Sequence, residues 1–231
     1  MTFLVLLGAP GAGKGTQAPI LADRLGLPHV ATGDLFRSAV REGSAVGLEA
    51  RRFMERGQLV PDSITVKMLL DRLAQPDARR GAILDGFPRN LAQAGVLATA
   101  LADRDSQVDI ALEIAVPEAE LVRRLSGRWI CKANGHVYNE NSHPPRVAGL
   151  CDLDGSALIQ RDDDRRETVV ARLAVQLGLL QEVVDYYREH GLLRTIDGLR
   201  PVAEVTEGLL AAARAVSDPA PHQVRANGAA N

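Results

Sequence analysis

The chain has 231 residues, of which 46% are hydrophobic and 24% are charged, and its formal net charge is −2. This length and composition are typical of one globular domain with room for a small insertion, and a charge near zero excludes the broad basic surface of a general nucleic-acid binder. No apolar run approaches the ~18 residues that cross a membrane, no leader or cleavage signal precedes the first apolar run, and two cysteines are too few for a disulfide framework, so we expect a cytoplasmic protein with no membrane or nucleic-acid partner.

The first apolar run, residues 3–7, has the character of a buried parallel strand, and it leads into GAPGAGKGT, which runs from Gly8 to Thr16. A helical pattern follows from Lys14. A strand, a glycine-rich turn and a helix N-terminus form the phosphate-binding loop, G-x-x-x-x-G-K-[ST], whose backbone N–H groups surround nucleotide phosphates. The spacing fits at Gly8, Gly13 and Lys14, although Gly15 follows the lysine and the hydroxyl comes one place later. An ordinary glycine-rich turn is the alternative, but strand, spacing, lysine and helix together predict a nucleoside triphosphate site.

The rest of the chain alternates short apolar runs with longer amphipathic ones, which is typical of an α/β fold with a doubly wound parallel sheet. Four further strands are predicted over residues 28–31, 82–84, 110–116 and 193–196. Helices are predicted over residues 14–25, 33–42, 45–56, 62–74, 90–103, 118–125, 165–190 and 201–216. The pattern therefore predicts a five-stranded sheet covered by eight helices.

One region breaks this alternation. Residues 127–164 contain both cysteines, the pair Pro144 and Pro145, and short β-like pieces such as HVY, which predict a small inserted subdomain. We interpret the acidic residues 162–164 as the start of the next helix, where negative charge is favourable. The polar, proline-bearing segment 217–231 is predicted to be disordered.

Polar residues follow two of the predicted strands. The second strand leads into TGDLFR, with Thr32, Asp34 and Arg37, and the third leads into DGFPRNLAQ, which runs from Asp85 to Gln93. The carboxyl ends of parallel strands meet at one edge of the sheet, where open α/β sheets bind ligands. We therefore expect a second ligand site beside the glycine-rich loop.

These stretches together resemble the adenylate kinase family. GAPGAGKGTQ, TGD-x-x-R, RGQLVPD, DGFPR with Gln93 four residues beyond its arginine, RLSGR, QRDDD and Arg172 follow in the family's order, from residue 1 to about residue 213. The resemblance implies a P-loop NTPase fold with a core at 1–126 and 165–216, an AMP-binding part of that core at 31–60, and a lid at 127–164. It also implies a cytoplasmic, monomeric enzyme that reversibly transfers the γ-phosphoryl group of Mg-ATP to AMP and gives two ADP.

The resemblance further implies which residues act. The ATP site would consist of the glycine-rich loop and side chains near the lid, namely Gly11, Ala12, Gly13, Lys14, Gly15, Thr16, Arg124, Arg128, Val137, Tyr138 and Arg200. The AMP site would consist of Thr32, Arg37, Gln58, Leu59, Val60, Gly86, Phe87, Pro88, Arg89, Gln93, Arg161 and Arg172. The catalytic cations among them would be Lys14, Arg89, Arg128, Arg161 and Arg172. Asp34 and Asp85 would hold water molecules around the Mg²⁺ ion of Mg-ATP.

The chemistry of the residues agrees with this reading. Phosphoryl transfer between two polyanions depends on positioning and on stabilising charge on the equatorial oxygens. Arginine donates two parallel hydrogen bonds to a phosphate and stays charged when water is excluded. A hinged lid would keep water from hydrolysing ATP.

Three alternative functions can be compared with the sequence. A GTP-dependent switch protein needs an N-K-x-D segment, and the sequence has none. A P-loop regulator that does not transfer phosphate would lack the arginine-bearing stretch after the third strand. A UMP/CMP kinase is the nearest rival, but the long insertion favours an adenylate kinase of the bacterial type.

The insertion departs from a pattern found in part of the family. Zinc-bearing relatives carry C-x2-C followed by C-x2-C or C-x2-D, and the corresponding positions here are Cys131, Asn134, Cys151 and Asp154. Neutral asparagine is a poor zinc ligand, and His136 is the candidate to replace it. We expect a polar cluster in which Asp154 accepts hydrogen bonds, and no structural zinc.

Overall fold

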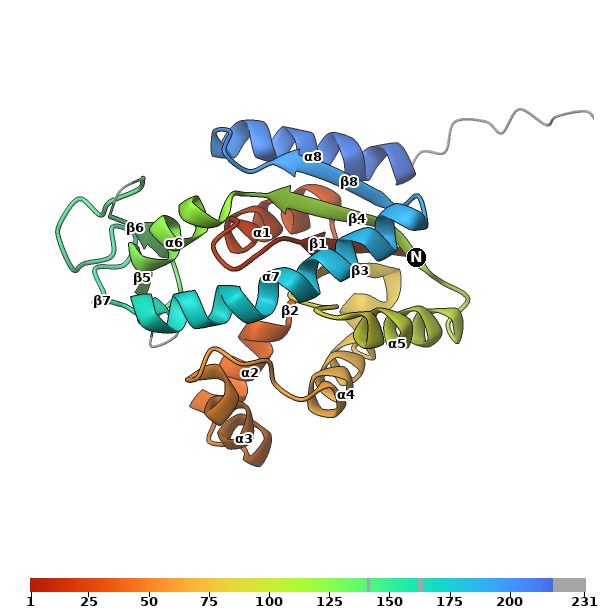
Figure 1. Cartoon of the computed structure of the whole chain (residues 1–231), viewed down its shortest axis with the longest axis horizontal. Helices are drawn as coiled ribbons and strands as arrows, with labels where there is room; N and C mark the ends of the chain where they lie inside the picture. Colours follow the sequence, from red (N-terminus) through yellow and green to blue (C-terminus); the bar gives the residue numbers. More distant parts are fainter. Residues whose placement is uncertain (141, 162–163, 218–231) are drawn as a thin grey trace, which may run out of the picture.

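The computed structural model describes residues 1–140, 142–161 and 164–217. Its centre is a parallel five-stranded sheet in the order β2-β3-β1-β4-β8 (Figure 1). The strands are β1 (Thr2–Leu7), β2 (His29–Ala31), β3 (Gly81–Asp85), β4 (Val108–Ala115) and β8 (Leu193–Asp197). The α/β class and all five predicted strands are confirmed. Since β1 lies between β3 and β4, the loop after β1 opens at the point where the strand order reverses, which is where such sheets bind ligands.

The eight predicted helices are also confirmed, with ends that differ by a few residues. They are α1 (Lys14–Leu25), α2 (Thr32–Arg41), α3 (Ala45–Met54), α4 (Asp62–Leu73), α5 (Leu91–Ala102), α6 (Glu118–Ser126), α7 (Arg166–Glu189) and α8 (Val202–Ser217). A short 3₁₀ helix, η1 (Pro76–Arg80), was not predicted. The segment predicted to be disordered lies outside the described residues, except that its first residue, Ser217, ends α8.

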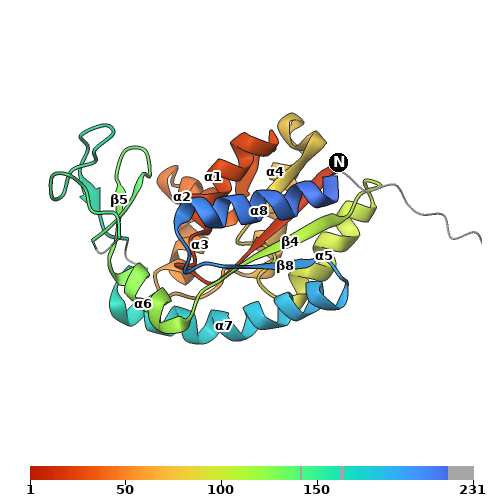
Figure 2. The same cartoon turned by 90° about the horizontal axis from the view of Figure 1, so that it is seen from above.

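Both faces of the sheet are buried, which explains why its strands are almost continuously apolar. Alternate residues of β1 point to opposite faces: Leu4 and Leu6 pack against α1 and α8, and Phe3 and Val5 pack against α4, α5 and the second half of α7. Figures 1 and 2 show these two helical layers on either side of the sheet. Each fully buried side chain of this kind stabilises the fold by ~1.5–3 kcal/mol. The core thus fixes the strand ends that carry the polar residues.

Helices α2 and α3 extend from the sheet edge beside β2 and pack with α4 (Figure 1). A small apolar cluster around Phe36, Ala50 and Val60 holds them together. The hydroxyl of Ser44 caps α3 by accepting a hydrogen bond from the backbone N–H of Gly47 at 3.1 Å. This unit therefore has its own cluster of buried side chains beside the main sheet.

The predicted insertion forms a second, antiparallel sheet in the order β6-β5-β7. Its strands are β5 (Arg128–Cys131), β6 (Val137–Asn139) and β7 (Leu158–Ile159), so that HVY contributes to β6 as expected. Among the described residues of the insertion, the apolar cluster contains Cys131, Tyr138, Cys151 and Leu158, with Trp129 partly buried against it. A core this small cannot stabilise a unit by apolar burial alone, so polar contacts or a metal must contribute.

Within the residues that the structure describes, no helix has both the length and the apolar character needed to cross a membrane.

Candidate functional site

A large cleft opens at the carboxyl ends of β1, β2 and β3, between the sheet and the insertion. Its volume of about 1670 Å³ exceeds the ~300–1,000 Å³ of a site for one small molecule. A smaller pocket lies between α2, α4 and the segment after β3, and Arg37, Arg89 and Arg172 line both hollows. The cleft and the pocket therefore meet at three arginines, an arrangement suited to two anionic ligands that face each other.

The glycine-rich loop follows β1 and forms one wall of the cleft. Gly8 has φ +144°, and a Cβ atom there would lie 2.9 Å from the carbonyl oxygen of Ile114, so this position requires glycine. Helix α1 begins at Lys14, directly after Gly13. The first backbone N–H groups of a helix have no partner within the helix, and they attract anions. This geometry suits the loop to bind a phosphate group, and the phosphate site stays a prediction.

The ammonium group of Lys14 lies across this loop. Its Nζ donates hydrogen bonds to the carbonyl oxygens of Gly8 at 2.6 Å and Ala9 at 3.2 Å. The pKa of Lys14 is lowered to about 8, chiefly because the ammonium group is buried; the carboxylate of Asp85 opposes this change, and the positive charge of Arg89 adds to it. A bound polyphosphate would add negative charge beside Lys14 and favour its charged form, which suits this point to phosphate binding.

Asp85 ends β3 beside the lysine and is paired with His29 on the neighbouring strand. The parallel register of β2 and β3 sets Ala31 opposite Asp85, and His29 Nε2 lies 3.2 Å from Asp85 Oδ2. Burial disfavours the charged carboxylate, but the His29 hydrogen bond and the charge of Lys14 outweigh burial and hold the pKa of Asp85 below its ordinary value. Sequence reasoning missed His29, because only the register brings it to the carboxylate.

Several cleft arginines are paired with carboxylates. Arg37 Nη2 lies 2.5 Å from Asp34 Oδ1, and Arg124 Nε lies 2.7 Å from Glu120 Oε1. Arg124 also donates to the carbonyl oxygen of Gly198 at 2.9 Å. The Arg37–Asp34 pair is solvent-exposed, and such pairs contribute only ~0–1 kcal/mol. A phosphate can therefore displace Asp34 from Arg37 at little cost.

Arg128 is anchored more firmly. It ion-pairs through two nitrogens with the carboxylate of Asp164, one of them Nε at 2.7 Å, and the Asp164 side chain is 0% exposed. Breaking a pair of this kind leaves an uncompensated buried charge. The interpretation of residues 162–164 as a plain helix start was therefore wrong for Asp164, which precedes α7 and fixes Arg128. Residues 162 and 163 lie outside the described residues.

The turn after β3 joins the cleft to the pocket. Gly86 has φ +74°, and its carbonyl oxygen accepts hydrogen bonds from Thr32 Oγ1 at 2.8 Å and from Arg89 Nε at 2.7 Å. A Cβ at Gly86 would lie 2.8 Å from Arg89 Nη2 and 3.1 Å from Thr32 Oγ1. The peptide bond between Phe87 and Pro88 is cis. The turn thus needs glycine so that Arg89 and Thr32 can approach its backbone closely.

Most of the predicted site residues line the two hollows. The cleft is lined by all of the predicted ATP-site residues, together with Asp34 and Asp85. The predicted AMP-site residues Thr32, Arg37, Gln58, Leu59, Val60, Gly86, Pro88, Arg89, Gln93, Arg161 and Arg172 line the pocket or the cleft. Phe87 is the exception: its side chain is 1% exposed and packs in the core against the sheet, so only its backbone is left for the predicted AMP contact, which stays a prediction.

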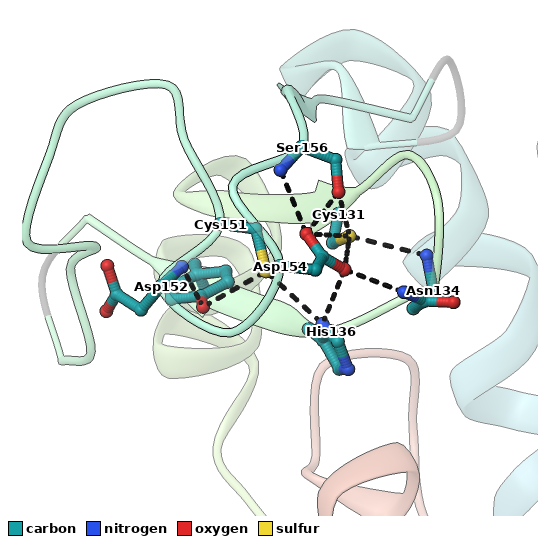
Figure 3. A network of polar contacts seen from close by, with 8 residues as sticks. Cys131, Asn134, His136, Cys151, Asp152, Asp154 and Ser156 are labelled. Carbon is teal, nitrogen blue, oxygen red and sulfur yellow. Dashed lines mark hydrogen bonds and ion pairs between the residues drawn. The ribbon is translucent and has the colours of Figure 1, made fainter.

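The insertion contains the predicted polar cluster (Figure 3). Asp154 Oδ2 accepts hydrogen bonds from Asn134 Nδ2 at 2.7 Å and from Cys131 Sγ at 3.2 Å, so its predicted role as an acceptor is confirmed. His136 belongs to the same cluster, with Nδ1 3.2 Å from Cys151 Sγ and 3.4 Å from Asp154 Oδ2. The cluster therefore joins both cysteines to one imidazole and one carboxylate.

This cluster also fits a metal ion. The potential ligand atoms of Cys131, His136, Cys151 and Asp154 lie within 4.8 Å of one another. Structural zinc takes four ligands chosen from thiolate, imidazole and carboxylate. His136 can thus supply the fourth metal ligand in place of Asn134. The four side chains fit zinc better than the four positions aligned with the zinc-bearing relatives indicated.

Comparisons with known proteins point to one family. The sequence model of the adenylate kinase family matches residues 6–192. The chain is 48% identical to an adenylate kinase of Streptomyces griseus over 213 residues, which cover 92% of this chain and 97% of the relative. It is 48% identical to an adenylate kinase of Exiguobacterium sibiricum over 87% of this chain and 94% of the relative, and 43% identical to one of Staphylococcus aureus over 90% and 96%.

Proposed function

The chain belongs to the adenylate kinase family, and we propose how its cleft divides the two substrates of the family's reaction. As a member it is an ATP:AMP phosphotransferase, which moves the γ-phosphoryl group of ATP to AMP and gives ADP. The observation that carries the proposal is the meeting of two hollows at Arg37, Arg89 and Arg172. Two nucleotides bound on either side would set their terminal phosphates against these arginines.

ATP takes the side of the glycine-rich loop. Residues 11–16 surround its phosphates with backbone N–H groups, and Lys14 contacts the transferred group. Arg124 and Arg200, with Val137 and Tyr138 of the insertion, lie around the base. This assignment is supported by the start of α1 at Lys14 and by the position of all these side chains in the cleft wall.

AMP takes the side of the smaller pocket. Arg37 and Arg89 hold its α-phosphate, and Gln93 contacts the adenine at the inner end of the pocket. The rest of the AMP site is formed by Thr32, Gln58, Leu59, Val60, Gly86 and Pro88. Support comes from the exposed Arg37–Asp34 pair, which an anion can displace. Support also comes from the turn at Gly86, which orients Arg89.

The cations between the substrates then stabilise the transferred phosphoryl group. Arg128, Arg161 and Arg172 donate hydrogen bonds to its equatorial oxygens together with Lys14 and Arg89. No covalent intermediate is required, because the fixed charges supply the stabilisation. Arg128 is suited to this role because Asp164 holds two of its nitrogens and leaves other N–H groups for the cleft.

The acidic residues of the cleft suit a hydrated Mg²⁺ ion. Mg²⁺ prefers oxygen ligands and keeps several of its water molecules. Asp85 stays ionised beside the loop, and Asp34 is freed when a phosphate displaces it from Arg37. When bound with ATP, the ion neutralises charge on the phosphates, and Asp34 and Asp85 would orient its water molecules.

The remaining assignments concern the whole chain. We propose a core at 1–126 and 165–216, with an AMP-binding part at 31–60, and a lid at 127–164 that excludes water when it closes. A monomer suffices, because one chain supplies every side chain assigned above. Two free cysteines, Cys131 and Cys151, suit the reducing conditions of the cytoplasm. Cys131, His136, Cys151 and Asp154 would hold a zinc ion that supports the small core of the lid.

A panel of acceptors tests the proposal. With Mg-ATP as donor and AMP, CMP, UMP and GMP as acceptors, chromatographic measurement of the diphosphate products should give the highest kcat/KM for AMP. A higher kcat/KM for UMP or CMP would contradict the AMP assignment. ATP hydrolysis that does not depend on any acceptor would instead indicate a P-loop protein that does not transfer phosphate.

A further inference from the structure

The side-chain amide of Gln93 is held from both ends. Its Nε2 donates a hydrogen bond to Asp62 Oδ1 at 2.6 Å, and its Oε1 accepts one from the backbone N–H of Arg89 at 2.8 Å. Gln93 is only 1% exposed, although it lines the proposed AMP pocket. Both ends of the amide are therefore engaged by the protein before any ligand is present.

The chemistry of these two partners permits one orientation of the amide. An ionised carboxylate only accepts hydrogen bonds, and a backbone N–H only donates. If the amide turned over, Gln93 Oε1 would face the Asp62 carboxylate and Nε2 would face the N–H of Arg89, so two hydrogen bonds would become two repulsive contacts. A buried polar group left without a partner costs ~1–3 kcal/mol. The amide is thus fixed with its oxygen toward Arg89 and its nitrogen toward Asp62.

Asp62 is itself held in place. It lies at the start of α4, and the side-chain Nδ2 of Asn90 lies 3.2 Å and 3.0 Å from its two carboxylate oxygens. Asn90 Oδ1 in turn accepts a hydrogen bond from the backbone N–H of Gln93 at 2.8 Å, and Asn90 is thereby the N-cap of α5. The carboxylate and the glutamine are therefore positioned by one connected network that joins α4 to α5.

We propose that Asp62 is a positioning residue that makes the acceptor site select adenine over guanine, an inference that rests on the proposed placement of AMP. Once Asp62 and Arg89 are satisfied, the amide of Gln93 has one N–H and one oxygen lone pair left. Adenine offers an N6–H donor and the N1 acceptor, which match an amide in this orientation. Guanine offers the O6 acceptor and an N1–H donor at the same places, and it would need the amide to turn over. Asp62 prevents that turn without touching the nucleotide.

The test is Asp62→Asn, which keeps the size of the side chain and its acceptor for Asn90 but adds a donor that can pair with Gln93 Oε1. The ratio of kcat/KM for AMP to that for GMP should fall at least about tenfold, because the turned amide is no longer opposed on this side. UMP has the hydrogen-bond pattern of guanine and should gain relative to AMP as GMP does. CMP has the pattern of adenine, so its ratio to AMP should stay within about twofold.

The matched control is Asp71→Asn, the same substitution at an exposed position near the other end of α4, which should leave all ratios unchanged. Equal changes for CMP, UMP and GMP would show that Asp62 only supports the pocket, and an unchanged AMP to GMP ratio would also overturn the inference. Gln93→Ala separates this inference from the placement of AMP. If Gln93→Ala leaves the KM for AMP unchanged, the placement fails; if it raises that KM while Asp62→Asn does not alter selectivity, only the inference fails.

Discussion

The affinity for ATP should fall as the pH rises through about 8. Lys14 has its pKa lowered to about 8 in the ligand-free protein because it is buried in the glycine-rich loop. Bound triphosphate favours the charged ammonium group, so binding is strongest when Lys14 already carries its proton. Above its pKa the free protein must take up a proton before it binds, and the observed affinity falls.

The size of the effect follows from the pKa of Lys14. The observed Kd is proportional to one plus the ratio of neutral to charged lysine, so it should rise about twofold by pH 8 and about tenfold between pH 7 and pH 9. Isothermal titration calorimetry with Mg-ATP in the absence of AMP measures the Kd across this range. Titrations in buffers of different ionisation enthalpy measure the proton taken up on binding.

Lys14→Met is the control, because methionine cannot titrate. Its Kd should be higher than that of the unchanged protein at pH 7 and should change little up to pH 9. A wild-type Kd that is constant from pH 7 to pH 9 would refute the assignment of Lys14 to the phosphates. The same slope in both proteins would show that another group titrates.

Three further experiments test other parts of the structure. Arg89→Ala should lower kcat by several orders of magnitude without unfolding the protein, because it removes a phosphate contact that strengthens in the transition state; circular dichroism checks the fold. Gly86→Ala should raise the KM for AMP more than that for ATP and should lower the free energy of unfolding by ~1–3 kcal/mol, since φ +74° and the 2.8 Å approach of Arg89 both oppose a Cβ. A Gly86→Ala protein with unchanged stability and KM would remove the argument from the turn. Zinc added to metal-free protein should raise Tm, because the ion binds the folded insertion. His136→Ala should abolish this rise in Tm, whereas Asn134→Ala should leave it unchanged. Equal responses of the two variants to zinc would exclude His136 as a ligand.

The fold was predictable because its elements are strongly periodic. The run of residues 3–7 has the length and character of a buried strand, and β1 occupies Thr2–Leu7. Helix α7 was predicted over 165–190 and occupies Arg166–Glu189. The elements that were missed are too short to show a period: η1 has five residues, β5 has four and β7 has two. Their conformations depend on tertiary contacts more than on local pattern.

The site was predictable where a local motif carries the chemistry, as in the glycine-rich loop and the DGFPR turn. The residues that hold the site residues in place were not predictable from the sequence. His29 reaches Asp85 through the register of two parallel strands, and Asp62 meets Gln93 through the packing of α4 against α5. Asp164 resembled a residue of a helix start but forms a buried pair with Arg128. Each partner is far away in sequence, so only the tertiary structure brings the pairs together.

The central claim is that the cleft transfers the γ-phosphoryl group of ATP to AMP by means of its arginines. The most direct measurement follows γ-labelled ATP in the presence of AMP, with Arg89→Ala compared against Arg79→Ala, an exposed arginine on η1 that lines neither the cleft nor the pocket. The account predicts that label passes to ADP in the wild-type and Arg79→Ala proteins and that Arg89→Ala transfers label several orders of magnitude more slowly. Label released as free phosphate without AMP, or equal transfer by Arg89→Ala and Arg79→Ala, would contradict it.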